Sequence, residues 1–543
     1  MGESSSDPTP IADFATLAGV RDDLQAPARG SVFGQRGVVA SGQTLATLAG
    51  LDTLRAGGNA VDAALAVSAV MAVVQPYSSH LGGDAFCLIR TAAGDTLALN
   101  AGGRAPLAAT PERFPGGVPR RGATAVAVPG LVDAWCAFHG RFATRPLGEL
   151  LAPAVALARD GFRISQSLGR AMRAAQDELA ADAGCRQAFL DHGTPRSGDV
   201  LRQPDLAYTL EAIAADGRDG FYGGEVGRRI VSHLRERDGL LTEEDFAREQ
   251  AVWGEPLSIT YRGWRVYEQP LPSQGFLTLE ALNIVEGFDL AQQPLLSAET
   301  VHAMSSAMRL AFADRDAFAG DPDAVDVPID RLLSKEHAAE LRQRIASGER
   351  AEVTTPLHGG DTTSFAVADG EGNLVSFIQS IFQPWGAAVL VPGTGVLLND
   401  RMLGFSLDPV SPNVLRPGRR TVHTLNTWLL ERDDGLLYAG GTPGADFQVQ
   451  TNLQNLCGLV DWGLDAQSAI DAPKWALSGS GDLALEARFP RETAAELERR
   501  GQRVVWASAW EAALCRSQIV ARRPDGALLA ASDLRGEGGA LGW

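Results

Sequence analysis

The stretch HGGDTTSFAVADGEGN, residues 358–373, decides how the rest of the chain is interpreted. Two glycines and an acid lead directly into Thr362-Thr363, and the residues after them alternate as strand, turn and strand around Glu371-Gly372-Asn373. A loop that enters a β-hairpin is the ordinary interpretation of such a stretch. A threonine at the start of the strand, directly after Gly359-Gly360-Asp361, also suits a chain that cuts itself at this point.

A threonine hydroxyl becomes a useful nucleophile only when a base is held beside it. If the chain is cut directly before Thr362, the freed α-amine has an unperturbed pKa of about 7.7–8.0 and can accept the hydroxyl proton near neutral pH. The β-branched side chain has few rotamers and stays aimed, and the preceding glycines permit the strained loop that self-cleavage needs. These residues support the hypothesis of a threonine nucleophile at position 362.

Composition narrows the function classes. The 543 residues carry a net charge of -18, which argues against nucleic acid and against anionic membrane surfaces as partners. Five widely spaced cysteines without a CxxC pair predict neither a disulfide framework nor a zinc site. We expect a soluble, cytoplasmic protein, because the first residues lack a basic and apolar leader and no apolar run is long enough to span a membrane.

Known catalytic motifs are mostly missing. The sequence contains no P-loop, no H-E-x-x-H and no G-x-S-x-G, so we expect neither a cofactor nor a metal. A Ser-His-Asp arrangement stays open, because triads assemble from distant residues.

The predicted elements change in character at Thr362. Helices or helix-rich stretches are expected first, then strands, in this order: a loose segment 1–35, two helices in 42–76 with Asn59 as a cap, a hairpin in 85–100, a mostly helical 130–260, a helix in 298–320, a polar linker 340–361, and further hairpins in 364–380, 388–399 and 424–441. Sheets covered by helices on their outer faces suit this order.

Nine stretches, in this order and at these spacings, resemble the gamma-glutamyltranspeptidase family of N-terminal-nucleophile hydrolases, from about residue 36 to the C-terminus. They are LRAGGNAVDAALA (54–66), SSHLGGDAF (78–86), AVPGLVDA (127–134), GLLTEEDFA (239–247), QPLPSQGFLTLEALNIVEGFDL (269–290), AFADRDAFAGDPD (311–323), DTTSFAVADGEGNLVSF (361–377), PGTGVLLND (392–400) and GGTPGADFQ (440–448).

The resemblance implies a mixed α/β fold, a four-layer αββα sandwich, and a precursor that cuts itself between Asp361 and Thr362. The products would be a large subunit, 36–361 after the flexible residues 1–35, and a small subunit 362–543. These two would form a heterodimer, with a dimer of such units left open.

The family's catalytic positions are retained. Thr362 is then the nucleophile, and Ser380 matches the second hydroxyl residue that hydrogen-bonds it. Gly444 and Ala445 match the pair whose backbone N–H groups hold the oxyanion, and an alanine keeps the second amide.

The positions that hold a glutamyl group in the family differ. Phe382 replaces the amine-binding asparagine, Gly404 replaces the amine-binding aspartate, and His423-Thr424 replace a serine pair. Because a buried ammonium without partners is costly, we expect this pocket to reject a glutamyl amino group.

The arginine that binds the α-carboxylate in the family is Gly102 in this chain, and Arg104 stands two residues further on. In an extended segment Arg104 keeps the same face. It could therefore reach the site and bind an anion, or it could be an ordinary surface arginine.

Two classes of function follow. The first is a self-processing threonine amidohydrolase or acylase that acts on a small-molecule amide of a non-glutamyl acid, of the oxo or dicarboxylic type. Within the family, a true gamma-glutamyl hydrolase or transpeptidase with a glutathione-type substrate, or an enzyme that cleaves a carbon–carbon bond in a biosynthetic pathway, remains an alternative. The second class is an unprocessed, inactive scaffold. Retention of Thr362, Ser380 and the oxyanion loop favours the first.

Overall fold

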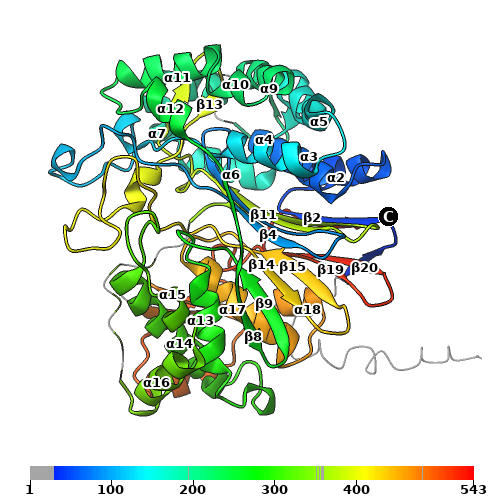
Figure 1. Cartoon of the computed structure of the whole chain (residues 1–543), viewed down its shortest axis with the longest axis vertical. Coiled ribbons are helices and arrows are strands. Elements are labelled where there is room, and N and C mark those ends of the chain that lie inside the picture. The colour runs from blue at the N-terminus through cyan, green and yellow to red at the C-terminus, as the bar shows by residue number, and fades with distance from the viewer. Residues whose placement is uncertain are drawn as a thin grey trace, which may run out of the picture.

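The computed structural model describes residues 30–543 apart from positions 192, 194, 350, 352, 354, 356, 358, 359 and 480. Within this part of the chain, two seven-stranded antiparallel sheets lie face to face, and helices cover both outer faces (Figure 1). The expected four-layer αββα sandwich is therefore confirmed.

The nucleophile sheet, which carries the strand after Thr362, has the order β21-β2-β10-β11-β3-β4-β7. Its strands are β2 (Gly37–Ser41), β3 (Asp84–Arg90), β4 (Thr96–Ala101), β7 (Val252–Gly254), β10 (Thr363–Asp369), β11 (Leu374–Ser380) and β21 (Gly539–Gly542). The facing sheet has the order β1-β20-β19-β15-β14-β9-β8. It comprises β1 (Val32–Gly34), β8 (Leu257–Tyr261), β9 (Trp264–Glu268), β14 (Trp428–Glu431), β15 (Leu437–Gly441), β19 (Gln518–Arg522) and β20 (Leu528–Ser532).

Successive side chains of β10 point to opposite faces of the sheet, so this strand contributes to two layers of the core. Phe365 and Val367 belong to the core under the helices, whereas Ala366 and Ala368 pack between the two sheets. Small side chains on the inner face let the sheets approach, and all seven residues of β10 are buried. By the same alternation Thr362, directly before β10, continues the face that looks toward the other sheet.

Each helix layer has its own core (Figure 1). Over the nucleophile sheet lie α2 (Thr44–Arg55), α3 (Ala60–Val74), α4 (Leu131–Phe142), α5 (Leu147–Asp160) and α9 (Pro204–Asp216). Against the facing sheet lie α13 (Phe276–Val285), α14 (Ala298–Phe318), α16 (Lys335–Ala346), α17 (Phe447–Val460) and α18 (Ala466–Asp471). In the described residues, no helix combines the length and the apolar character that crossing a bilayer requires.

Most expected elements are present. Residues 42–76 form α2 and α3, and Asn59 accepts hydrogen bonds from the N–H groups of Val61 and Asp62, as a helix cap does. Antiparallel pairs β3–β4, β10–β11 and β14–β15 occupy the expected hairpins, and the hairpin in 388–399 is a short one, β12 (Leu390–Val391) with β13 (Val396–Leu397).

Two expectations need correction. Within the supposedly loose segment 1–35, Val32–Gly34 form β1, because they pair with β20; residues 1–29 lie outside the described part. The stretch 130–260 is mostly helical, as expected, and it ends in strands β7 and β8, which pair with β4 and β9. The polar linker 340–361 begins later than expected, because α16 continues to Ala346 with Leu341 and Ile345 buried.

Candidate active site

The strand register brings Thr362 and Ser380 together. Thr363 pairs with Gln379 across β10 and β11, so one further step places Thr362 opposite Ser380, at the end of the sheet. Ser380 in turn pairs with Asp84 at the start of β3. Side chains of directly opposed residues point to the same face. Thr362, Ser380 and Asp84 therefore form a row that faces the second sheet.

The Thr362 hydroxyl is in contact with the peptide bond that precedes it. Its Oγ1 lies 2.7 Å from the carbonyl oxygen of Asp361 and 3.1 Å from Ser380 Oγ. Ser380 Oγ is also 3.0 Å from that carbonyl oxygen and accepts the Phe382 N–H at 2.8 Å. A hydroxyl beside the carbonyl that it would attack, with a second hydroxyl on the oxygen where charge develops, is an arrangement suited to self-cleavage.

The oxyanion loop, Gly444-Ala445, lies against Gly360. The loop joins β15 to α17, and both residues have positive φ, 132° at Gly444 and 49° at Ala445. The left-handed conformation is unusual for alanine, and the methyl group of Ala445 has a cost. A Cβ on Gly360 would lie 2.8 Å from the Ala445 Cβ. The segment before the cleavage site thus needs a residue without a side chain at position 360.

We expect Gly360→Ala to slow maturation at least about tenfold, because overpacking of this size typically costs 1–3 kcal/mol and about 1.4 kcal/mol is tenfold in rate. The double variant Gly360→Ala with Ala445→Gly removes the opposing methyl group and should restore cleavage. Maturation is followed by denaturing gel electrophoresis over time. Slow cleavage in the double variant would show that the contact with Ala445 is not the cause.

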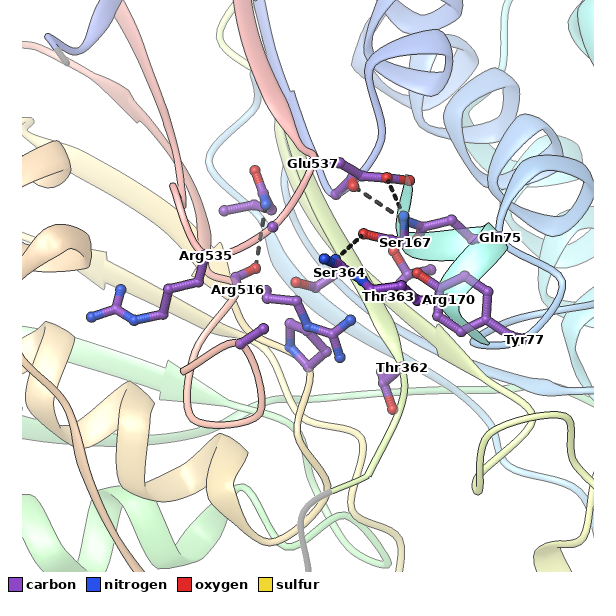
Figure 2. A pocket seen from close by; sticks show the side chains of 15 residues that line it. Gln75, Tyr77, Ser167, Arg170, Thr362, Thr363, Ser364, Arg516, Arg535 and Glu537 are labelled. Atoms are coloured by element: carbon purple, nitrogen blue, oxygen red, sulfur yellow. Dashed lines mark hydrogen bonds between the residues drawn. The ribbon is translucent and has the colours of Figure 1, made fainter. Parts of the chain in front are cut away.

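An arginine clamps the residue on the other side of the scissile bond. Arg516 Nη2 lies 2.8 Å from Asp361 Oδ1, and the same carboxylate oxygen accepts the Thr362 N–H at 3.1 Å. Both contacts hold Asp361 in one orientation. A cavity of about 170 Å³ opens beside this clamp; among its lining residues are Tyr77, Arg170, Thr362, Thr363, Ser364, Arg516 and Glu537. Figure 2 shows Thr362, Thr363 and Ser364 in succession along one strand at its edge.

Beyond Ser380, the row continues into a buried ion pair. Arg401 Nε donates to Asp84 Oδ2 at 2.9 Å, and both side chains are almost completely buried. The Arg401 guanidinium also stacks on the Phe382 ring, with 4.2 Å between its central carbon and the ring centroid. Its two terminal nitrogens, Nη1 and Nη2, have no hydrogen-bond partner among the described residues.

His423 contacts this ion pair through Asp84. Its Nε2 lies 3.1 Å from Asp84 Oδ2, and its Nδ1 accepts the Leu425 N–H at 3.2 Å, so Nε2 carries the proton. Burial, and then the Arg401 guanidinium, lower the pKa of His423 to about 4. His423 is therefore a neutral donor that orients Asp84, and both of its nitrogens are occupied. Thr424 follows it, half-buried, and its carbonyl accepts from Asn426 Nδ2.

Two of the positions that hold a glutamyl group in the family are glycines in this chain, Gly102 and Gly404, and both are enclosed by neighbouring side chains. A Cβ on Gly102 would lie 3.1 Å from both the His423 and the Phe86 rings. A Cβ on Gly404 would lie 2.9 Å from Thr421. Neither position has room for the larger side chain that the family pattern places there. The replacements at Gly102 and His423 thus share one packing contact, whereas Gly404 is enclosed separately by Thr421.

Arg104 points elsewhere. Its guanidinium donates to the Gly418 carbonyl at 3.2 Å and lies 3.5 Å from the Asp323 carboxylate. Among the described residues it makes no hydrogen bond to the Thr362–Ser380 pair. Of the two possibilities that the sequence left open for Arg104, this geometry favours the arginine that stabilises a surface loop.

The sequence alone did not identify Asp84, Arg401 or Arg516. Two signals were available: Asp84 lies within the SSHLGGDAF stretch, and Arg401 directly follows PGTGVLLND. Neither signal says that the two segments meet, because that contact spans 317 residues. Trp385, three residues after Phe382, packs in the core against Tyr77 and Phe189.

One group of side chains in the described residues has the donor set of a metal site. Glu280, Asp314 and His337 place one ligand atom each within 4.8 Å of one another, on α13, α14 and α16. Burial raises the pKa of Glu280 to about 8, and the neighbouring Glu280 and Asp314 carboxyls raise that of His337 to about 9. His337 Nε2 lies 2.7 Å from Asp314 Oδ2, whereas both Glu280 oxygens lack a hydrogen-bond partner among the described residues, and we assign this cluster no part in the reaction.

Comparison with known proteins agrees with this geometry. The family model described as gamma-glutamyltranspeptidase matches residues 46–543. The glutathione hydrolase-like YwrD proenzyme of Bacillus subtilis (strain 168) is 36% identical over 524 residues, which cover 94% of this chain and 99% of the relative. The acylase ACY 1 proenzyme of Pseudomonas sp. (strain SE83) is 35% identical over 523 residues, 93% of each chain.

The fold matches as well. The crystal structure of cephalosporin acylase from Bacillus halodurans matches with a TM-score of 0.89 at 36% identity, over 100% of this chain and 99% of the other. The chain therefore belongs to the gamma-glutamyltranspeptidase family and is an N-terminal-nucleophile hydrolase, an enzyme that hydrolyses amide bonds or transfers their acyl group.

Proposed function

We propose that the chain is a proenzyme that cuts itself between Asp361 and Thr362, and that the freed Thr362 then hydrolyses amides of acids without an α-amino group. The products of maturation are a large subunit that ends at Asp361 and a small subunit 362–543, which stay together as a heterodimer in the cytoplasm. The observation that carries the first part is the contact of 2.7 Å between the Thr362 hydroxyl and the Asp361 carbonyl.

The chemistry of maturation follows from this contact. The Thr362 hydroxyl attacks the Asp361 carbonyl carbon and its proton passes to the departing amide nitrogen, so the peptide bond becomes an ester. Ser380 donates to the carbonyl oxygen as charge develops on it. Water then hydrolyses the ester, which leaves the Asp361 carboxylate and a threonine with a free hydroxyl and a free α-amine.

The same groups serve turnover. The α-amine takes the hydroxyl proton, Thr362 attacks the substrate carbonyl, and the N–H groups of Gly444 and Ala445 are suited to hold the oxyanion. The amine product leaves, and water releases the acid from the acyl-enzyme. The chain keeps the nucleophile, the second hydroxyl and the oxyanion loop of the family. Their retention favours this function over an inactive scaffold.

The proposal about the substrate rests on the positions that hold a glutamyl amino group in the family. No carboxylate can be placed at Gly404 without a clash with Thr421, and Phe382 offers an aromatic ring instead of an amide. Besides Asp84, Asp400 is an acid in this region; its Oδ1 accepts the Gln383 N–H at 3.0 Å, and its Oδ2 lies 3.9 Å from Arg121 without a hydrogen-bond partner among the described residues. An α-ammonium group would still lack the amide and carboxylate partners that the family pattern has at positions 382 and 404.

The decisive assay uses two anilides that differ only in the amino group, γ-glutamyl p-nitroanilide and glutaryl p-nitroanilide. We expect kcat/KM for the glutaryl compound to be at least about tenfold higher, which corresponds to about 1.4 kcal/mol. Amino-acid acceptors should increase the rate little, since water is the usual acceptor. A clear preference for the γ-glutamyl anilide would instead show that the chain is a glutamyl hydrolase or transpeptidase that holds the zwitterion differently.

A further inference from the structure

We propose that Arg401 is the residue that binds the acyl group's distal carboxylate, and that the substrates are amides of dicarboxylic acids. This inference rests on the proposed function and names the group that recognises the acid. Three features of Arg401 support it: a buried guanidinium, one committed nitrogen and two uncommitted ones.

The hydrogen-bond inventory of Arg401 is incomplete without a ligand. A guanidinium has five N–H donors, and the Nε–H goes to Asp84. The four N–H groups on Nη1 and Nη2 are buried and have no partner among the described residues. Leaving charged donors unpaired inside a protein is costly. The edge formed by Nη1 and Nη2 has the geometry that binds a carboxylate through two parallel hydrogen bonds.

The surroundings hold the guanidinium in place for an incoming anion. Asp84 fixes the Nε side, His423 orients Asp84, and the Phe382 ring covers one face. Asp400 contributes a further negative charge, and it is turned toward Arg121 and the Gln383 N–H. Because His423 is neutral, Asp84 alone offsets the charge of Arg401 directly. A ligand carboxylate would supply the acceptors that the protein does not.

The position of Asp84, which holds Arg401, relative to the nucleophile gives the scale for the length of the acid. Ser380 and Asp84 occupy successive strands beside Thr362, so Asp84 lies about 10 Å from it across two strand spacings. A five-carbon diacid separates its carboxyl carbons by about 5 Å, from four carbon–carbon bonds of about 1.5 Å. With a covalent contact at one end and a hydrogen bond at the other, a glutaryl chain spans this interval. An oxalyl group, with a single carbon–carbon bond, is too short.

The test compares glutaryl p-nitroanilide with pentanoyl p-nitroanilide, which carries a methyl group in place of the distal carboxylate. The ratio of their kcat/KM values measures recognition of the carboxylate and cancels differences in the amount of active enzyme. We expect the mature wild-type enzyme to prefer the glutaryl compound, and Arg401→Gln to reduce this ratio about 10- to 100-fold. Arg401→Lys keeps the charge beside Asp84 but binds at one point, so an intermediate ratio is expected.

Two controls keep the inference open to refutation. Self-cleavage of each variant reports whether Thr362 and Ser380 are in place, and Arg401→Lys covers the case in which loss of the partner of Asp84 prevents folding. An unchanged ratio in both Arg401 variants would overturn the inference. So would a ratio that falls in Arg104→Ala and stays constant in the Arg401 variants, or an oxalyl anilide that is hydrolysed as fast as the glutaryl one.

The test of Arg401 and the test of the proposed function can succeed or fail independently. The preference for glutaryl over γ-glutamyl substrates tests whether an amino group is rejected. The preference for glutaryl over pentanoyl substrates, and its dependence on Arg401, tests where the carboxylate binds. The second result can hold when the first fails, because a γ-glutamyl group also carries a distal carboxylate.

Discussion

We expect Thr362→Ala to leave the chain whole at 57.3 kDa, and we expect the wild-type protein to separate on a denaturing gel into two fragments cut between Asp361 and Thr362. The variant lacks the hydroxyl that lies 2.7 Å from the Asp361 carbonyl oxygen, so nothing attacks that peptide bond. Turnover of any amide should fall at least about 10⁴-fold, since loss of a nucleophile has effects of this size or larger. Intact-mass spectrometry of both proteins measures the first effect.

Thr362→Ser is the matched control, because it retains a hydroxyl at the same position and should still mature. Ser380→Ala should cleave slowly, since Thr362 and the carbonyl oxygen each lose a partner at about 3 Å. A wild-type chain that stays intact after long incubation would contradict the mechanism and support the scaffold interpretation. A Thr362→Ala chain that is still cut at Asp361 would assign the cleavage to another group.

Acetylation of the freed α-amine of Thr362 should abolish turnover, with a loss of about 10²–10⁴-fold typical of a missing general base. Few other amines compete for the reagent, because Lys335 and Lys474 are the only lysines and Lys474 is buried, which leaves Lys335 and the α-amine of the large subunit. Peptide mapping identifies the acetylated amines, and Lys335→Arg provides a matched control. Subunit pattern and melting temperature should stay unchanged.

The assignment of the α-amine as the general base also determines the direction in which activity changes with pH. The base must be unprotonated, so kcat/KM should be full above the amine pKa of about 7.7–8.0 and fall about tenfold per pH unit below it. His423 cannot replace the amine, because both of its nitrogens are occupied and burial lowers its pKa to about 4. An acid limb near pH 4, or full activity after acetylation, would indicate a base other than the α-amine.

The pairing of Thr362 with Ser380 is within reach of the sequence. Both residues belong to one hairpin, and the turn at Glu371-Gly372-Asn373 sets its register. In an antiparallel pair the sum of opposed residue numbers is constant, so a turn placed correctly puts position 362 opposite 380. Local alternation also says which face they share. The helix pair at 42–76 and the hairpin at 85–100 follow from equally local patterns.

The substrate side of the site has a different origin. Arg401 meets Asp84, and Asp84 meets His423, only because β3 and β11 are neighbours in the nucleophile sheet and the segments around 401 and 423 return to its end. The sequence placed an arginine near this region, at Arg104, but could not tell that its guanidinium turns to Gly418 and Asp323. Side-chain direction at the end of a strand depends on what packs there.

The sequence by itself therefore determined the family and the layered fold, and it carries the prediction of the cleavage position and the nucleophile, because each rests on local periodicity or on a contiguous motif. Only the tertiary structure decided which arginine lacks a partner beside the nucleophile and which glycines are enclosed by neighbours. The contacts of Arg401 with Asp84 and of Gly102 with His423 join segments more than 300 residues apart. Strand order and packing set such contacts, and no local propensity encodes them.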